Sequence, residues 1–261
     1  MDRFAIVTGA SSGIGLELGR TLVQQGFEVW GLSRRQPPGD SGIKGMQLDL
    51  SSLDSLNTWV HQTLEPKLNQ WEGELVLVHN AGDLGPVVPQ WRLEDFAGFQ
   101  RSFNLHVLAG ARLAQSVLAR VQQGGRLKVT LAFMISGAAT KAYEGWGSYC
   151  SCKAALRMLL MVLAKESKKF LEQPGIDLMF YNLDPGPTST SMQDDIRQMS
   201  PENLPNVQRF VELHQDEQLN LPKDIAADFG SMVFGDHRPY YVEKRVGAPP
   251  SDVAPTPQDL R

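Results

Sequence analysis

The sequence is poor in cysteine and contains no long apolar run. Its 261 residues include only two cysteines, and the N-terminal segment MDRFAIVTGASSG has an early acidic residue and a short apolar run, unlike a signal peptide. Few cysteines without an export signal are typical of a reducing compartment, so we expect a cytoplasmic protein. No stretch reaches the roughly 18 apolar residues that suggest a membrane span, so we expect no membrane partner.

Basic residues do not outnumber acidic ones, and histidines are few. Lys and Arg number 25 against 29 Asp and Glu, which gives a formal net charge of −4. Because no basic stripe stands out, nucleic acid is not an expected partner. The five histidines and two cysteines lack the spacing of metal ligands, so no metal site is predicted. The 42% apolar content suits a globular domain with a full-sized core.

Both cysteines lie in the segment YCSCK (149–153). Residues two apart on a helix turn about 200° from each other, so Cys150 and Cys152 point apart and cannot form a disulfide together. Tyr149 and Lys153, four apart, share one helix face. We interpret the cysteines as small packing groups and the phenol and amine as the candidate chemistry.

Apolar runs alternate with helical patterns through most of the chain. Strands are predicted at 4–9, 27–33, 45–50, 74–82, 127–136 and 176–186, and helices at 16–26, 51–68, 93–122 and 148–170. Such alternation is typical of βαβ units with a parallel sheet, and strands that are apolar on both faces indicate helices on both sides. We therefore predict an α/β fold with a doubly wound parallel sheet in three α/β/α layers.

The pattern becomes polar and irregular after Pro187. Residues 188–222 are predicted to form loops and short helices over the sheet edge, either as a lid or as an excursion without motion. The segment GAPPSDVAPTPQDLR (247–261) has four prolines and little apolar surface, which is typical of a disordered or loosely packed tail. We predict a single domain over residues 1–246, followed by a proline-rich tail at 247–261.

A glycine-rich segment, TGASSGIG (8–15), joins the first predicted strand to the first predicted helix. Glycines allow a tight turn and a close backbone approach to a ligand, and the N-terminus of the following helix favours a pyrophosphate. A turn without a ligand is the alternative, but the position directly after the first strand favours a dinucleotide. The candidate cofactor contacts here are Gly9, Ser11, Ser12, Gly13, Ile14 and Gly15.

The end of the second predicted strand, GLSRR (31–35), has no acidic residue. In a NAD site an acidic residue usually binds the ribose hydroxyls at this point. Ser33, Arg34 and Arg35 occur there instead, and an arginine can clamp a 2′-phosphate that a carboxylate would repel. We predict NADP(H), with Asp49 placed to meet the adenine beside Leu50. Two solvated surface arginines are the alternative.

Tyr149 and Lys153 can supply acid–base chemistry. A free tyrosine has a pKa of about 10, and a neighbouring ammonium favours the phenolate, so we expect Lys153 to lower the pKa of Tyr149. Ser136, at the end of a predicted strand, can hold a substrate carbonyl oxygen while Tyr149 protonates it. The pair alone also fits an ordinary helix face. The pair follows the glycine loop, NAG (80–82) and Ser136 along the chain, and this order of motifs favours an active site.

These motifs together resemble the short-chain dehydrogenase/reductase family over roughly residues 3–190. The resemblance implies a Rossmann-like fold that binds NADPH and reduces a carbonyl group, and a homodimer or homotetramer. It implies that Ser136 orients the carbonyl, that Tyr149 is the general acid and that Lys153 binds the nicotinamide ribose. Asn104, in FNLH, would hold a water of the proton relay. Further cofactor contacts would come from Asn80, Ala81, Gly82, Pro185, Gly186 and Thr188.

Three segments are similar to the sepiapterin reductase branch of that family: NAGDLG (80–85), GWGSYCSCKAA (145–155) and DPGPTSTSMQ (184–193). This likeness implies a ketone, a diketone or a pterin side chain as substrate, with Trp146 and Met192 beside it. Glu243 is the nearest candidate by position for the acid that holds the pterin ring in that branch. His79 departs from the asparagine usual in the family, and the family's C-terminal strand is not evident in HRPYYVEKR (237–245).

One alternative from another class is a catalytically inactive dinucleotide-binding regulatory protein. The full set of Ser136, Tyr149, Lys153 and Asn104 argues against it, because a sensor has no need of a proton relay. An epimerase is not favoured, because the chain has no room for a separate substrate domain.

Overall fold

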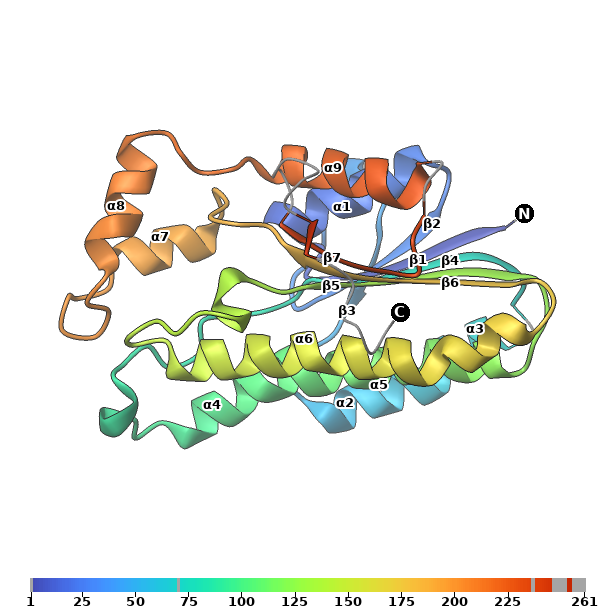
Figure 1. Cartoon of the computed structure of the whole chain (residues 1–261), viewed down its shortest axis with the longest axis horizontal. Coiled ribbons are helices and arrows are strands. Elements are labelled where there is room, and N and C mark those ends of the chain that lie inside the picture. Colours follow the sequence, from blue (N-terminus) through green and yellow to red (C-terminus); the bar gives the residue numbers. More distant parts are fainter. Residues whose placement is uncertain (1, 70, 236–237, 246–252, 255–261) are drawn as a thin grey trace.

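A parallel sheet lies between two layers of helices in the computed structural model, which describes all residues except 1, 70, 236–237, 246–252 and 255–261 (Figure 1). The strand order is β3-β2-β1-β4-β5-β6-β7-β8, and only the last pair is antiparallel. This confirms the predicted doubly wound α/β fold. The strands are β1 (Arg3–Thr8), β2 (Glu28–Ser33), β3 (Lys44–Gln47), β4 (Gly73–His79), β5 (Leu127–Met134), β6 (Ile176–Asp184), β7 (Tyr241–Arg245) and β8 (Val253–Ala254).

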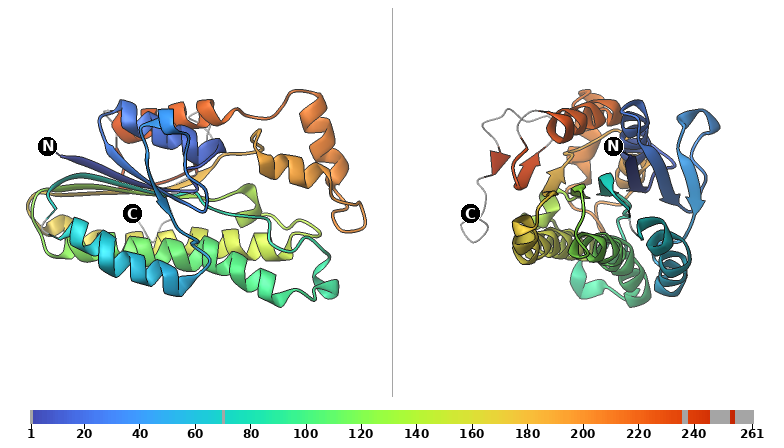
Figure 2. Two further views of the ribbon diagram at one scale, coloured as in Figure 1. Left: turned by 180° about the vertical axis from the view of Figure 1, so that it is seen from behind. Right: turned by 90° about the vertical axis from the view of Figure 1, so that its right-hand side faces the viewer.

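Helices cover both faces of the sheet, as Figures 1 and 2 show from three sides. One layer contains α1 and α9, the other contains α2 to α6, and α7 and α8 project beyond the carboxyl ends of the strands. The helices are α1 (Gly13–Gln24), α2 (Leu53–Trp59), α3 (Glu65–Leu68), α4 (Phe96–Phe103), α5 (Ala109–Gln122), α6 (Gly147–Ser167), α7 (Ser191–Arg197), α8 (Val207–Gln215) and α9 (Pro222–Phe234).

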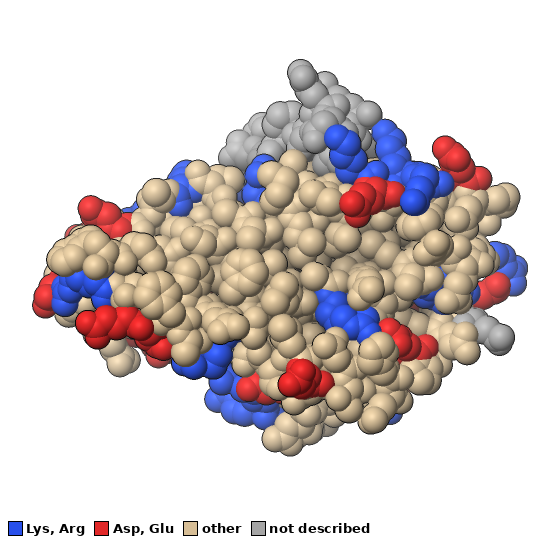
Figure 3. Space-filling model, turned by 90° about the horizontal axis from the view of Figure 1, so that it is seen from below, with Lys and Arg blue, Asp and Glu red and all other residues tan. Residues whose placement is uncertain are grey.

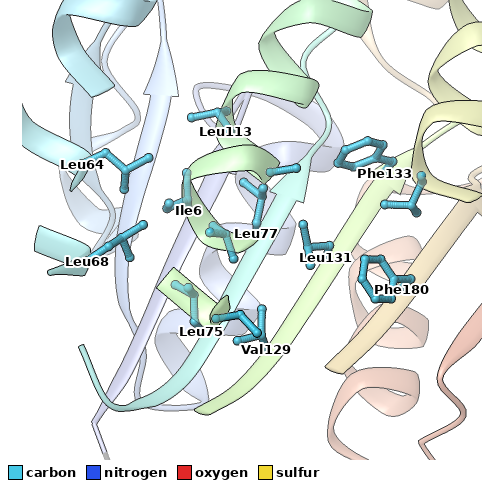
Figure 4. Close-up of a cluster of buried hydrophobic side chains, with 14 of the residues drawn as sticks. Ile6, Leu64, Leu68, Leu75, Leu77, Leu113, Val129, Leu131, Phe133 and Phe180 are labelled. Atoms are coloured by element: carbon cyan, nitrogen blue, oxygen red, sulfur yellow. The ribbon is translucent and has the colours of Figure 1, made fainter. Parts of the chain in front are cut away.

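The larger core lies between the sheet and the α2 to α6 layer (Figure 4). Leu75 and Leu77 of β4 and Leu131 of β5 are fully buried there and face side chains such as Leu113 of α5. Burying each such side chain contributes roughly 1.5–3 kcal/mol. The strands are apolar on their other face too, where Leu18 of α1 and Phe229 of α9 are fully buried. This two-sided burial explains why the strands read as continuous apolar runs.

Two predicted helices are interrupted by π-helical turns. The helix expected from Leu93 begins at Phe96, because the Asp95 carboxylate caps it by accepting a hydrogen bond from the Gly98 N–H at 2.8 Å. A π-turn at Asn104–Leu108 then separates α4 from α5. A second π-turn, Val60–Leu64, separates α2 from α3. A π-turn inserts one residue into a helix and often marks a functional position.

The C-terminal part differs most from expectation. Helix α9 was not predicted, and β7 lies where no C-terminal strand was evident, paired in parallel with β6 from Phe180↔Tyr241 to Asp184↔Arg245. Most of the expected tail at 247–261 lies outside the described residues. Its described part, Val253–Ala254, pairs with Lys244 and Glu243.

Within the described residues, one helical segment, Gly147–Glu172, is long and apolar enough by composition to cross a membrane, with a mean hydropathy of 1.2. Leu156, Leu160 and Ala164 of this segment are fully buried against the sheet. This face of α6 therefore belongs to the larger core.

Candidate active site

A cleft of about 1150 Å³ opens at the carboxyl ends of the strands. It lies between β1 and β4, where the strand order reverses. From β1 the chain continues through α1 to β2 on one side, and β4 lies on the other side. In doubly wound sheets this crevice is the usual ligand site. Most of the predicted cofactor contacts line it: Gly9, Ser11, Ser12, Gly13, Ile14, Ser33, Arg34, Arg35, Asp49, Leu50, Asn80, Ala81, Gly82, Tyr149, Lys153 and Pro185.

The glycine loop turns tightly between β1 and α1. Gly9 and Gly13 have φ of 70° and 57°, which side chains rarely adopt. Gly15 does not line the cleft. A Cβ there would overlap the Gly9 carbonyl oxygen and lie 2.6 Å from Asn80 Nδ2, so this glycine lets the loop pack on the neighbouring strand end. The loop thus leaves the α1 N-terminus open to the cleft, where its N–H groups can meet a phosphate.

The arginines at the end of β2 face the cleft and are exposed. Neither Arg34 nor Arg35 forms an ion pair within the described part of the chain. The Ser33 hydroxyl donates to the Arg35 carbonyl at 2.6 Å. Asp49 Oδ1 accepts from the Ser51 N–H at 2.9 Å. The cleft therefore has a cationic end at β2 and no carboxylate in the position that binds ribose hydroxyls in NAD sites.

His79, in place of the usual asparagine, is held in a closed network. The Thr8 hydroxyl accepts from the N–H groups of Asn80 and Ala81, both at 2.9 Å, and lies 3.1 Å from His79 Nδ1. His79 Nε2 lies 2.9 Å from the His106 carbonyl and donates to it, so Nδ1 accepts the Thr8 hydroxyl proton. Burial lowers the pKa of His79 to about 3. The ring is therefore neutral and ties β4 to β1 beneath the NAG turn.

Tyr149, in the first turn of α6, is buried and lines both the cleft and a smaller cavity beside it. Burial raises the pKa of Tyr149, while a hydrogen bond from Ser136 opposes the rise. The expected lowering by Lys153 was wrong. Lys153 Nζ lies 5.7 Å from the tyrosine ring centre and donates to the Met134 carbonyl at 2.8 Å. Because burial also lowers the pKa of Lys153 to about 8, desolvation dominates at both groups.

Asn104 lies apart from these groups. It begins the π-turn between α4 and α5, and its Nδ2 donates to the Ser51 carbonyl at 3.1 Å. It lines neither the cleft nor the smaller cavity. Its relay role stays a prediction.

The smaller cavity, of about 150 Å³, lies under α7 and α8. Ser136, Tyr149, Trp146 and Met192, the four predicted substrate contacts, all line it, and so do Gly186 and Thr188. The Thr188 hydroxyl is 3.1 Å from the carbonyls of Pro185 and Gly186 and donates within that turn. A third apolar cluster, which includes Trp146, Ile196 and Phe210, packs α7 and α8 over this cavity.

Glu243, the nearest candidate by position for a pterin-holding acid, lies elsewhere. Its carboxylate accepts from Arg157 Nε at 2.8 Å and from the Tyr241 hydroxyl at 3.1 Å, and it lines neither hollow. The acid on the cavity wall is Asp184, directly before the Pro-Gly turn. The position of β7 explains the difference, because Glu243 pairs with Asn182 inside the sheet.

Sequence reasoning also missed His106. It is fully buried, its Nε2 lies 2.9 Å from the Asp83 carbonyl and 3.1 Å from the Asp83 N–H, and its ring meets the Tyr149 ring edge-on at 5.9 Å. A Cβ on Gly82 would overlap this ring. His106 therefore connects the loop after the NAG turn with α6. The sequence offered one indication of this position, because His106 lies two residues after the candidate Asn104.

The cysteines behave as predicted: both are free, and Cys152 is buried. In the part of the chain that the structure describes, no group of three or more His, Cys, Asp or Glu residues is placed to hold a metal ion.

Comparison with known proteins places these features in context. A family model described as short chain dehydrogenase matches residues 3–201. The chain is 28% identical over 231 residues to a benzil reductase ((S)-benzoin forming) of Bacillus subtilis (strain 168), which covers 87% of this chain and 92% of that protein. It is 28% identical over 214 residues to sepiapterin reductase of Bos taurus, at 75% and 76% coverage. The crystal structure of the KRED1-Pglu enzyme matches with a TM-score of 0.71 and 25% identity, covering 96% of this chain and 98% of that one.

Proposed function

The chain belongs to the short-chain dehydrogenase/reductase family, and on that premise we propose that it is an NADPH-dependent carbonyl reductase acting on a ketone or diketone. One observation carries the proposal: Tyr149 lines both the dinucleotide-sized cleft and the small cavity that contains Ser136. A proton donor at this junction can reach a carbonyl placed beside a bound nicotinamide. Relatives named benzil reductase and sepiapterin reductase support a diketone or a pterin side chain as the substrate.

The residues present fit a bound dinucleotide. Gly9 and Gly13 let the loop approach it closely, and the α1 N-terminus faces its phosphates. When bound, the reduced nicotinamide supplies a hydride to the carbonyl carbon. Lys153 would bind the nicotinamide ribose.

The protein's own groups handle the proton. Ser136 would hold the carbonyl oxygen, and Tyr149 would give its proton to that oxygen as negative charge develops. A raised pKa keeps the Tyr149 phenol protonated at neutral pH, which is the form that a general acid needs. His106, packed edge-on against the Tyr149 ring, would fix the ring's orientation.

We propose NADPH rather than NADH because Arg34 and Arg35 line the cleft without carboxylate partners among the described residues. Arg34→Ala is expected to raise the KM for NADPH about tenfold or more and to change that for NADH little, since a charge-assisted hydrogen bond contributes roughly 1.5–3 kcal/mol. Steady-state kinetics with both cofactors test this choice. The control is Arg126→Ala, at an exposed arginine directly before β5. A preference for NADH in the unmodified chain would contradict the assignment.

The alternative is a dinucleotide-binding regulatory protein without catalysis. A screen of aryl ketones, diketones and pterins, followed through NADPH absorbance, separates the two. NADPH binding without turnover of any carbonyl compound would favour the regulatory role.

We also propose that the chain forms a homodimer or homotetramer through the α5 and α6 face. Met158 and Val162, one helical turn apart on α6, are exposed, as is Leu108 beside α5. Charged side chains are sparse over much of this side of the molecule (Figure 3). Light scattering should give a multiple of 28.9 kDa, and a paired Met158→Glu and Val162→Glu variant should give the monomer mass.

A further inference from the structure

The small cavity beside Tyr149 combines aromatic walls with uneven charge. Tyr143, Trp146 and Phe210 line it. The centre of the Trp146 ring lies 5.3 Å from the centre of the Tyr143 ring and 5.2 Å from that of the Phe210 ring. A cavity of about 150 Å³ holds one benzene-sized ring. The walls therefore suit one aromatic ring next to Ser136 and Tyr149.

Three cations and one carboxylate complete the wall. Arg245 Nε lies 3.9 Å from the Asp184 carboxylate, so these two charges offset each other. Lys141 and Arg209 are exposed, come from separate segments, and have no ion-pair partner in the described residues. The cavity thus has two uncompensated positive charges, although the whole chain carries a net charge of −4. Such a local field attracts anions and excludes cations.

Two polar atoms on the same wall have no partner. Trp146 Nε1 and Gln193 Oε1 are buried and lack hydrogen bonds within the described part of the chain. As whole residues, Trp146 and Gln193 are 6% and 7% exposed. Buried polar atoms normally have partners, and an unmade hydrogen bond there is costly. Both residues line the cavity.

We propose that the substrate is a single-ring aromatic ketone or diketone whose ring carries a carboxylate, recognised by Lys141 and Arg209. This inference rests on the proposed reductase function and adds the charge of the substrate to it. The aromatic walls take the ring, Ser136 and Tyr149 take the reacting carbonyl, and the cations take the carboxylate at the rim.

Two matched probes test the charge preference: 1-(4-carboxyphenyl)-1,2-propanedione and its 4-carboxamide, which share the ring and the reacting group. At low ionic strength the carboxylate should have a kcat/KM about tenfold higher than the carboxamide, and the ratio should fall as salt screens the rim. Arg209→Gln and Lys141→Gln should each lower the ratio to about threefold, and the double variant to about one. Lys169→Gln, in the 3₁₀ turn that follows α6, should keep the full ratio.

A ratio near one in the unmodified chain overturns the inference, as does a ratio that the double variant retains. The affinity for NADPH, measured by fluorescence titration, should not change in these variants. A loss of NADPH affinity at an unchanged ratio would assign the cations to the cofactor instead. Reduction of 1-phenyl-1,2-propanedione without a charge preference refutes only the carboxylate. Failure to reduce all three compounds also overturns the inference. If the wider screen of aryl ketones, diketones and pterins gives no turnover either, the reductase is refuted as well.

Discussion

Replacing His79 with asparagine should remove a large part of the acid sensitivity of the fold. His79 is 1% exposed and neutral, with a pKa of about 3 against 6.5 for a free histidine. Between these two values the unfolded chain binds a proton that the folded chain does not. The free energy of unfolding therefore rises with pH across this window and falls as the pH drops from 6.5 toward 3.

The size of the effect follows from these values. Each tenfold change in proton affinity is worth about 1.4 kcal/mol, so the full window corresponds to roughly 5 kcal/mol. Between pH 7 and pH 5, the His79 imidazole should account for about 2 kcal/mol of lost stability. Asparagine does not titrate, so the His79→Asn variant should lose about 2 kcal/mol less than the unmodified chain over that interval.

Urea unfolding at pH 7 and pH 5, at one protein concentration, measures this difference. His214→Asn, an exposed histidine on α8, is the matched control and should keep the pH dependence of the unmodified chain. Because His106 stays in all three proteins, its contribution cancels in the comparison. Equal losses of stability in the His79→Asn variant and the unmodified chain, within about 0.5 kcal/mol, would refute the assignment of His79 as a buried neutral ring.

Two further predictions concern the cofactor side of the cleft. Gly15→Ala would place a methyl group against the Gly9 carbonyl and Asn80, so it should cost about 1–3 kcal/mol and weaken NADPH binding about tenfold or more. Gly39→Ala is the control, because a Cβ there meets nothing within 4 Å. It should change neither the free energy of unfolding, measured with urea, nor the NADPH affinity, measured by titration. Equal effects of the two substitutions would count against the close packing of Gly15 on Gly9 and Asn80. Since the pKa of Lys153 is lowered to about 8, kcat/KM for NADPH should fall as pH rises through that value and Lys153 loses its charge. A profile that stays flat to pH 10 would contradict a functional ammonium there.

The sheet could be predicted because its strands are buried on both faces. Residues such as Leu75 to Val78 are all apolar, and each run ends in a glycine or a polar turn, so local sequence was sufficient. The glycine loop and the Tyr149–Lys153 pair were equally visible, because their spacing encodes a turn and a shared helix face. The structure brings most of the residues predicted from these motifs to one crevice.

The C-terminal elements were less visible for different reasons. β7 has only five residues, and the last three, Glu243 to Arg245, are charged. It forms a strand because the edge of β6 offers it hydrogen-bonding partners. Helix α9 did carry a signal: Ile225, Phe229 and Val233 recur every four residues after Pro222, a favoured first helical residue. The π-turn at Asn104 has no comparable signature in the sequence.

The electrostatics of the site depended on the tertiary structure. Spacing correctly placed Tyr149 and Lys153 on one face but gave no measure of burial, and burial sets the direction of both pKa changes. The acid on the wall of the smaller cavity could not be chosen by position either. Asp184 lies there because β6 ends at the cavity, whereas Glu243 faces Arg157.

The central claim is that Tyr149 delivers the proton in a carbonyl reduction, and Tyr149→Phe tests it most directly. The substitution removes one hydroxyl and keeps the ring that packs against His106 and Trp146. We expect NADPH affinity within about threefold of the unmodified chain and kcat reduced at least a hundredfold, because general acid catalysis typically contributes 10²–10⁴. Full turnover of the diketone by Tyr149→Phe, with NADPH still bound, would contradict the account.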